Sequence, residues 1–257
     1  MAYKLIEGGG VTTPKGFLAG ACYVGVKSRK SEKPDVAIIY SEQPASCAAM
    51  FTTNKFCAAP VILDREILKK GKARAVVINS GNANAATGEQ GIKDAKTVET
   101  EAEKLLGLGE DEVFVCSTGV IGQKLPVEKV LEGVRRIVPD MSVEKGTDAA
   151  WAIMTTDLVK KEVAYELELS GGTIRIGACA KGSGMIHPNM ATMLAYITTD
   201  AKIDAAVVQP MLKASTDKSF NMMTVDGDTS TNDSLFLLAN GASGVAVETE
   251  ADKAAFA

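Results

Sequence analysis

The chain has 257 residues, of which 46% are hydrophobic and 23% charged, a balance typical of globular proteins and unlike that of disordered or fibrous ones. Its formal net charge is −4, with acidic and basic residues interspersed throughout, so we expect no nucleic-acid partner. No apolar run approaches the ~20 residues of a transmembrane helix, and the first residues lack a signal-peptide pattern, so we expect a cytoplasmic protein without membrane contact.

The cysteines indicate neither a metal site nor a disulfide framework. They are scattered without a CxxC pair, and His187 is the one histidine that could join them as a ligand. We therefore expect no metal, and we expect the cysteines to pack as small buried hydrophobic side chains in a reducing compartment. They stand at Cys22, Cys47, Cys57, Cys116 and Cys179.

Hydrophobic patterning predicts strands and helices in mixed order. Short β-branched runs predict buried strands at 36–40 and 75–78, followed by an amphipathic helix over 92–106. A third strand is predicted at 113–116 and a second amphipathic helix over 127–138. The apolar positions of the two helices are Ile92, Ala95, Val98, Ala102, Leu105 and Leu106, and Val127, Val130, Leu131, Val134, Ile137 and Val138.

The later part of the chain adds an antiparallel pair. Pro126 suits the first position of the second helix. Polar and apolar residues then alternate over 162–169 and 173–178 around a Ser-Gly-Gly turn, which predicts a hairpin that ends just before Lys181. Helices mixed with an antiparallel pair predict α/β or α+β layers and not a purely parallel doubly wound sheet. The length suits one large domain or two smaller ones.

The most unusual segment follows that hairpin. Residues 181–200 read Lys-Gly-Ser-Gly-Met-Ile-His-Pro-Asn-Met-Ala-Thr-Met-Leu-Ala-Tyr-Ile-Thr-Thr-Asp. Free backbone rotation at the glycines and a turn at Pro188 could bring the Thr192 hydroxyl to the Ala191 carbonyl. The peptide bond could then rearrange to an ester, and hydrolysis of that ester would split the chain.

A new N-terminal Thr192 would carry a hydroxyl and an α-amine together. An α-amino group titrates near ~7.7–8.0, so it can accept the hydroxyl proton without help from His187. Gly-rich loops before strands are common, however, and most strand threonines only pack. The residues of this segment alone leave both interpretations open.

Several other distinctive stretches are spread along the chain. They are Asn79-Ser80-Gly81-Asn82-Ala83-Asn84 with Thr87-Gly88, Cys116-Ser117-Thr118-Gly119-Val120-Ile121-Gly122, Met154-Thr155-Thr156-Asp157, and Ser219-Phe220-Asn221 through Asp233. Together with Pro-Asn-Met-Ala-Thr-Met-Leu at 188–194, they resemble the ornithine acetyltransferase family. The resemblance covers essentially the whole chain, from Gly8 to beyond Asn240.

The resemblance implies roles for the residues at two of these motifs. Thr192 would be the nucleophile, released by self-cleavage after Ala191. Thr118 and Gly119 would form the oxyanion hole that holds a tetrahedral intermediate. By pattern alone, the stretch that contains Thr118 and Gly119 is a strand-to-helix turn with outward amide groups.

Substrate contacts are implied at Thr155, Thr156, Lys181 and Thr192. Thr155 is favoured over Thr156 as the first threonine of its motif, although the sequence does not separate the two; by pattern alone they form a capped loop. Lys181 would meet a substrate carboxylate, whereas by pattern alone it is a solvated surface lysine.

The acidic stretch at 226–233 resembles a calcium loop only superficially. Glycine stands at its second position and not its sixth, and the twelfth position is Leu237 and not a glutamate. The resemblance implies a polar loop beside the active site, and no metal.

The implied reaction moves acetyl from N-acetylornithine to glutamate through acetyl-Thr192, with no cofactor, in arginine biosynthesis. Acetyl-CoA is a possible further donor. A first alternative is a hydrolase, because self-processing aminopeptidases share the architecture but use serine and act on peptides. A second is a binding protein of the same fold that does not cleave itself. Acetyl-transfer assays and a denaturing gel would separate these.

The family implies a four-layer α/β/β/α sandwich in which residues 1–191 form an α chain and residues 192–257 the start of a β chain. Two of each would assemble into a heterotetramer. Family members continue well past Ala257, and Asp252 to Ala257 look like the start of a helix, so we expect this chain to be truncated at its C-terminus.

Overall fold

The computed structural model describes residues 3–27, 33–185 and 193–257. Its strands are β1 (Tyr3–Leu5), β2 (Phe17–Cys22), β3 (Val36–Phe51), β4 (Lys72–Asn82), β5 (Val113–Val120), β6 (Lys161–Leu169), β7 (Gly172–Lys181), β8 (Leu194–Thr199) and β9 (Ser234–Ala239). Its helices are α1 (Ala59–Leu68), α2 (Gly88–Leu106), α3 (Val127–Ile137), α4 (Gly146–Ala152), α5 (Ala205–Asp217) and α6 (Glu250–Phe256), with short 3₁₀ turns at Val138–Asp140, Val143–Lys145 and Phe220–Met222.

The strands form a mixed sheet in the order β1-β6-β7-β8-β9-β3-β4-β5, with β2 also paired to β3. The β4–β5 and β8–β9 pairs are parallel and the other pairs are antiparallel. Strand β3 is long enough to serve both halves of the sheet. Its first part pairs with β2 and β4, its last part pairs with β9, and the register with β4 shifts between Tyr40 and Ala45.

The sheet folds over at β3, so that its two halves face each other across a shared core. Phe114 of β5 and Phe236 of β9 meet there with ring centroids 4.7 Å apart, and the Tyr196 ring of β8 stacks on Phe236. Successive strand residues alternate between this core and an outer one: Phe114 points inward, whereas Val113 and Val115 pack outward. The two outer cores are covered by helices.

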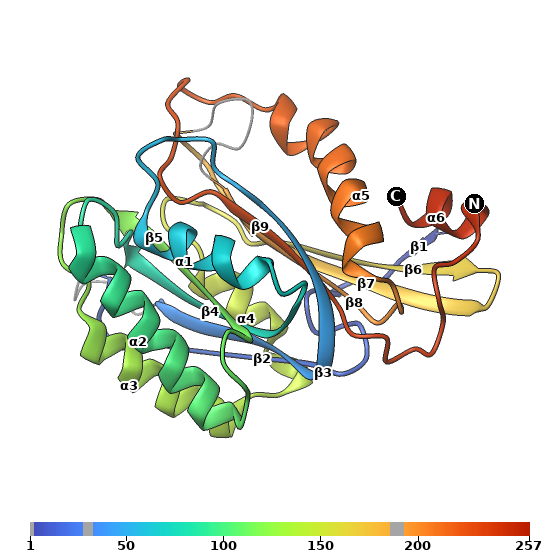
Figure 1. Ribbon diagram of the computed structural model, residues 1–257, viewed down its shortest axis with the longest axis horizontal. Coiled ribbons are helices and arrows are strands. Elements are labelled where there is room, and N and C mark those ends of the chain that lie inside the picture. The colour runs from blue at the N-terminus through green and yellow to red at the C-terminus, as the bar shows by residue number, and fades with distance from the viewer. Residues whose placement is uncertain (1–2, 28–32, 186–192) are drawn as a thin grey trace.

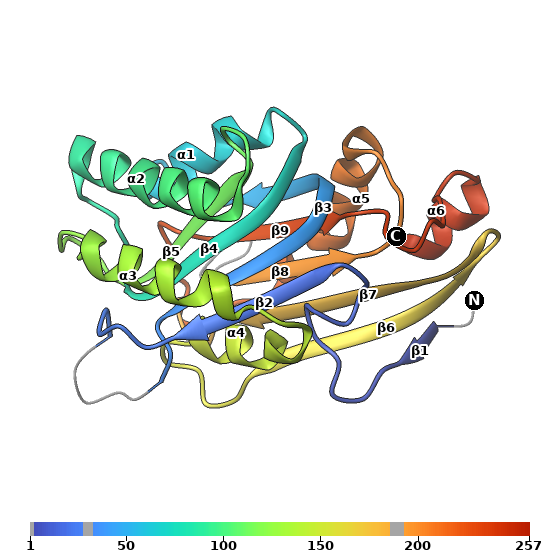
Figure 2. The same ribbon diagram turned by 90° about the horizontal axis from the view of Figure 1, so that it is seen from below.

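Figures 1 and 2 show the layers that result. Helices α2 and α3 cover the outer face of the half that contains β4 and β5, while α5 packs on the outer face of the half that contains β8 and β9. Helix α4 contributes Ala149 and Ala152 to the core between the two halves. The expected α/β/β/α sandwich is therefore present, and the mixed sheet agrees with the predicted antiparallel component.

The predicted elements are found, with longer strands than expected. The strands predicted at 36–40, 75–78 and 113–116 lie inside β3, β4 and β5, and the predicted hairpin is β6–β7. The strand predicted at 36–40 is too short, because Ser-Glu-Gln-Pro at 41–44 resembles a turn. In the structure these residues are part of β3 and lie where its register with β4 shifts. The helix expected to start near Asp252 is α6.

Two details of the helix predictions are wrong. Ile92 and Leu105 are 37% and 39% exposed, because α2 turns a face that contains Gly91, Asp94 and Glu99 toward the sheet. Pro126 precedes α3 as its N-cap and is not its first helical residue.

The cysteines are all free thiols, but only three of them are buried. Cys47, Cys116 and Cys179 pack in the core between the sheet halves, whereas Cys22 and Cys57 are half-buried, because they lie at the end of a strand and in a loop. Among residues 3–27, 33–185 and 193–257, no helix is long and apolar enough to cross a membrane.

One buried carboxyl contributes to the stability of this fold in a pH-dependent way. Asp64 of α1 is fully buried, its Oδ1 accepts the Val115 amide at 2.9 Å, and its Oδ2 has no hydrogen-bond partner among the described residues. Burial raises the pKa of Asp64 well above its ordinary value; the Val115 amide opposes this, and nearby Glu99 adds to it. Folding therefore binds a proton at Asp64.

We expect Asp64→Asn to stabilise the protein increasingly as pH rises. Because the folded-state pKa is raised, the contribution of Asp64 to stability is fully present below the unfolded pKa and is lost as pH rises through the folded value. The asparagine can still accept the Val115 amide, and at pH 8 the gain should be ~1–3 kcal/mol. Urea unfolding of both proteins at pH 5 and pH 8 checks this; a difference that does not grow with pH would refute it.

Candidate active site

A cavity of about 650 Å³ brings together most of the residues that the motifs single out. Thr118 and Gly119 come from the end of β5, Thr155 and Thr156 from the loop after α4, and Lys181 from the end of β7. The five come from both halves of the sheet and meet only because the sheet folds over. The cavity is also lined by Lys27, Gly81, Val120, Gly184 and Met185.

Gly119 occupies its place because two glycine backbones pack against each other. Gly119 has φ of 137°, and a Cβ at this position would lie 2.3 Å from the carbonyl carbon of Gly81. Gly81 has φ of 115°, and a Cβ there would lie 2.8 Å from the Lys27 amide nitrogen. Only glycine permits both the conformation and the contact. This packing sets the backbone position of the expected oxyanion hole.

Buried asparagine side chains hold the end of β4, which contains Gly81. Asn79 accepts the Ser117 hydroxyl at 2.6 Å and donates to the Asn82 carbonyl at 2.9 Å. Asn82 donates to the carbonyls of Gln123 and Lys124, beyond the end of β5. Through these hydrogen bonds, the two side-chain amides hold the end of β4 beside Thr118.

Asp157 ties the threonine loop to the end of β7. Its Oδ1 accepts the Gly182 amide at 2.8 Å and the Lys161 ammonium at 2.6 Å, and its Oδ2 accepts the Thr155 amide at 3.4 Å. Burial would raise the pKa of Asp157, but the Lys161 and Gly182 contacts outweigh it and the pKa is lowered. A charged Asp157 therefore holds Thr155 beside Lys181.

The two threonines differ in their hydroxyl contacts. The Thr156 hydroxyl shares a hydrogen bond of 2.7 Å with the Ser183 hydroxyl. That bond links the threonine loop to the segment after β7 a second time, and it occupies the Thr156 side chain. Both threonines line the cavity, so the preference for Thr155 as the substrate contact stays a prediction.

Lys181 is a buried lysine that lines this cavity, which corrects the pattern-based interpretation of a solvated lysine. It is 4% exposed, and burial lowers its pKa, while the carboxylates of Asp157 and Asp233 favour its charged form. Burial raises the pKa of Asp233 to about 7, against the effects of the Met193 amide and Lys181. A buried ammonium beside a cavity is suited to bind an anionic group.

The expected cleavage site, Ala191 and Thr192, lies outside the described residues, as does His187. The described chain resumes at Met193, which is buried. Its amide donates to Asp233 Oδ1 at 2.8 Å, and its carbonyl accepts the Ser234 amide at 3.2 Å. The residue that follows Thr192 is thus held at the start of β8, beside β9.

Comparison with known proteins identifies the family. A sequence model described as the ArgJ family matches residues 18–257. The chain belongs to the ArgJ family.

Curated ArgJ relatives are similar over most of this chain. It is 52% identical to the arginine biosynthesis bifunctional protein ArgJ of Symbiobacterium thermophilum over 92% of this chain and 59% of that protein. Against the protein of the same name from Lactococcus lactis subsp. lactis, the identity is 51% over 91% of this chain and 58% of that one. The chain therefore spans about three-fifths of the length of these curated relatives.

Solved structures of the ArgJ family share the fold. ArgJ from Bacillus halodurans superposes with a TM-score of 0.68 at 40% identity, covering 74% of this chain and 98% of that one. An ornithine acetyltransferase from Mycobacterium tuberculosis, solved with ornithine, gives 0.66 at 40% identity, with 73% and 98% covered. An aminopeptidase from Ochrobactrum anthropi, a variant of the Ntn hydrolase fold, gives 0.56 at 12% identity, a likeness of fold alone.

Sequence reasoning gave no site role to two notable residues that line the cavity. Gly81 was noticed only as part of a motif, and Lys27 not at all. The half-buried Lys27 donates to the carbonyls of Pro34 at 2.8 Å and Ala152 at 3.1 Å, and burial lowers its pKa to about 8. No local sequence pattern indicates a role for Lys27, because its contacts with these carbonyls form only in the folded chain.

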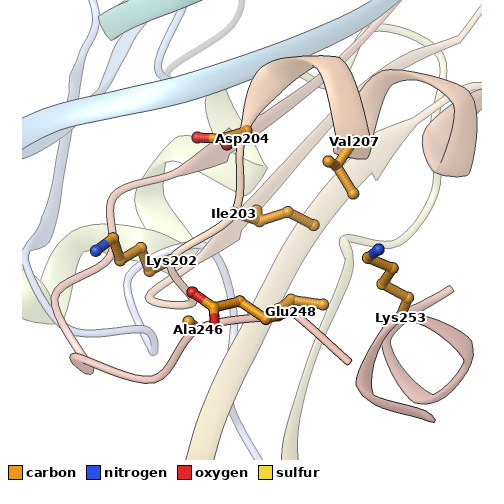
Figure 3. A pocket seen from close by; sticks show the side chains of 8 residues that line it. Lys202, Ile203, Asp204, Val207, Ala246, Glu248 and Lys253 are labelled. Carbon is orange, nitrogen blue, oxygen red and sulfur yellow. The ribbon is translucent and has the colours of Figure 1, made fainter. Parts of the chain in front are cut away.

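A second hollow of about 220 Å³ lies between the β8–α5 connection and α6 (Figure 3). Lys202, Asp204, Glu248 and Lys253 are among its lining residues, and none of the motif residues is. Within the described parts of the chain, no group of three or more His, Cys, Asp or Glu side chains is placed to hold a metal.

The glycine packing leads to a stability test with a control in the same turn. Gly122 has φ of 81°, but no atom lies within 4 Å of a Cβ built on it. Gly122→Ala should therefore cost only the ~1–2 kcal/mol of a left-handed backbone. Gly119→Ala should cost a further ~1–3 kcal/mol, because its methyl group would overlap the Gly81 backbone.

Urea unfolding of the two variants and the wild type measures these costs. Equal losses of unfolding free energy in Gly119→Ala and Gly122→Ala would show that the Gly81 contact does not constrain the end of β5.

Proposed function

We propose that this chain carries the catalytic centre of an ornithine acetyltransferase, which moves acetyl from N-acetylornithine to glutamate through an acetyl-Thr192 intermediate. The observation that carries the proposal is the single cavity lined by Thr118, Gly119, Thr155 and Lys181. The names of the ArgJ relatives, which place them in arginine biosynthesis, support the same conclusion.

The proposed reaction has two acyl transfers at one nucleophile. The Thr192 hydroxyl attacks the acetyl carbonyl, and the α-amine of the same residue accepts the hydroxyl proton. The tetrahedral oxyanion is held by the Thr118 hydroxyl and the Gly119 amide. Collapse breaks the amide bond, and the released ornithine nitrogen takes that proton. The neutral amine of glutamate then attacks the acetyl ester, the bond from the acetyl carbon to the Thr192 oxygen breaks, and the proton lost by the glutamate nitrogen passes through the Thr192 α-amine to that oxygen, which regenerates the hydroxyl.

Lys181 is proposed to bind the α-carboxylate that N-acetylornithine and glutamate have in common. The Lys181 side chain is buried and lines the cavity, where its amino group can contact an anionic substrate group. Thr155 adds a hydroxyl contact to the same substrate. Acetyl-CoA is proposed as a further donor, following the bifunctional relatives, and no cofactor is required.

Formation of the nucleophile requires a cut between Ala191 and Thr192, giving an α chain of residues 1–191 and a β chain that starts at 192. The coverage of the solved chains supports this division. The match covers 98% of the Bacillus chain but only 74% of this chain. Residues 1–191 are the same fraction, 74%, of the 257 residues. We propose that two α and two β chains assemble.

The first test is self-cleavage of the complete protein. Wild type should give two pieces, one ending at Ala191 and one starting at Thr192, while Thr192→Ala should stay whole and lack acetyl transfer, because it has no hydroxyl. Thr192→Ser should still cleave. Intact mass and N-terminal sequencing of every chain measure this. A cleaved Thr192→Ala protein, or an active wild type that is never cleaved, would overturn the proposal.

The second test concerns the oxyanion hole. Thr118→Ala should lower kcat for acetyl transfer by roughly 10²–10³, because one of two donors to the oxyanion is lost, with little change in KM. Thr97→Ala, on the exposed face of α2, is the control and should behave as wild type. Normal turnover with a greatly raised KM would assign Thr118 to substrate recognition instead.

A further inference from the structure

Residues 230–234 pass through the interior between the two halves of the sheet, and all five are buried. The Thr231 carbonyl accepts the Ala58 amide at 2.8 Å, and the Asp233 carbonyl accepts the Thr52 amide at 2.9 Å. The Thr52 hydroxyl donates to the Ser230 carbonyl at 2.9 Å. This segment is therefore fixed along its backbone, so its side chains can locate other parts of the chain.

Asn232 binds the strand that carries the oxyanion hole. Both hydrogens of its amide are used: Nδ2 donates to the Ser117 carbonyl at 2.8 Å and to the Ala83 carbonyl at 2.6 Å. The Ser117 carbonyl belongs to the peptide bond with Thr118. Asn232 thus fixes the backbone immediately before the proposed donor, and joins it to the loop after Gly81.

Asp233 binds Met193, the residue that follows the proposed nucleophile in the sequence and precedes β8. Its Oδ1 accepts the Met193 amide at 2.8 Å, and the adjacent Ser234 amide donates to the Met193 carbonyl at 3.2 Å. The Met193 amide belongs to the peptide bond with residue 192. Asp233 is 1% exposed, so water does not compete for this hydrogen bond.

We propose that Asn232 and Asp233 are a pair of positioning residues that set the separation between the oxyanion-hole strand and the start of the chain that carries the nucleophile. The inference rests on the proposed function, because it assigns that nucleophile to residue 192. The two residues are consecutive, with Cα atoms about 3.8 Å apart. A single peptide unit therefore fixes the distance between the residue that binds the Ser117 carbonyl and the residue that binds the Met193 amide. Displacing reacting groups by ~1 Å can cost about 10² in rate.

The first experiment compares Asn232 with a matched asparagine at the opposite end of β9. Asn240 is 7% exposed, donates to the Lys15 carbonyl at 2.9 Å and accepts the Ala242 amide at 3.0 Å, far from the cavity residues in the fold. In the complete protein, Asn232→Ala should lower kcat about 10²-fold and leave KM within about threefold. Asn240→Ala should lose comparable thermal stability and keep wild-type kcat.

The second experiment keeps the proposal testable if Asn232→Ala does not fold. Asp233→Ala removes the acceptor of the Met193 amide and should lower kcat about 10²-fold. Asp233→Asn retains an acceptor oxygen, so its kcat should be only about fivefold below that of wild type. Asp200, which follows β8 and accepts the Arg175 amide at 2.8 Å, provides the control: Asp200→Ala should leave kcat unchanged.

Three results would overturn the inference: a kcat for Asn232→Ala within threefold of wild type, equal kcat losses in Asn232→Ala and Asn240→Ala, or equal losses in Asp233→Asn and Asp233→Ala. The last result would indicate a role for the charge of Asp233 and not for its geometry. Thr192→Ala, assayed in parallel, separates this inference from the proposed function. If that variant transfers acetyl, the nucleophile assignment fails; if it is inactive, the outcomes above judge the positioning pair alone.

Discussion

The passage of β3 through both halves of the sheet is the constraint on which the site depends. One continuous backbone pairs with β4 at one end and with β9 at the other, so the halves cannot separate or slide without breaking its hydrogen bonds. The rings of Phe114 and Phe236 fill the space between them. Strand ends from both halves then meet at one cavity, with Thr118 on one side and Lys181 on the other.

Within that frame, glycine backbones and polar side chains set the position of Thr118 and Gly119, the proposed oxyanion hole. Gly119 and Gly81 allow two backbones to touch, and Asn79 and Asn232 bind the carbonyls and hydroxyls on either side of them. Such groups are costly to bury unless every donor and acceptor is satisfied. The polar motifs of the sequence therefore have a structural role in addition to the catalytic one that we propose.

Much of the architecture could be predicted from the sequence, because the short β-branched run at 113–116 and the helical spacing in α3 are local signals. The strand predicted at 36–40 was too short, because the residues that continue β3 resemble a turn in the sequence. Only the pairing of β3 with β9 shows that the strand goes on. Ile92 was counted among the apolar positions of α2 because a sequence pattern expects apolar side chains to be buried. In the structure, Asp94 and Glu99 are buried and Ile92 is exposed.

The site shows the same division between local and non-local information. Thr118, Gly119, Thr155 and Lys181 belong to distinctive motifs, and the structure brings them into one cavity. The contacts of Lys27, Asn232 and Asp233 depend on segments far away in sequence, and only the folded chain reveals them. That Lys181 is buried also follows from the fold, since a lysine beside glycines indicates nothing about depth.

The central claim is that acetyl is carried on Thr192 in a site built from both halves of the sheet. The most direct measurement is mass spectrometry of the processed, complete protein, quenched after mixing with N-acetylornithine in the absence of glutamate. The account predicts that the mass of one acetyl group appears on the peptide that begins with Thr192, and that added glutamate removes it. Acetyl on a different residue, or turnover without any acetylated peptide, would contradict the account.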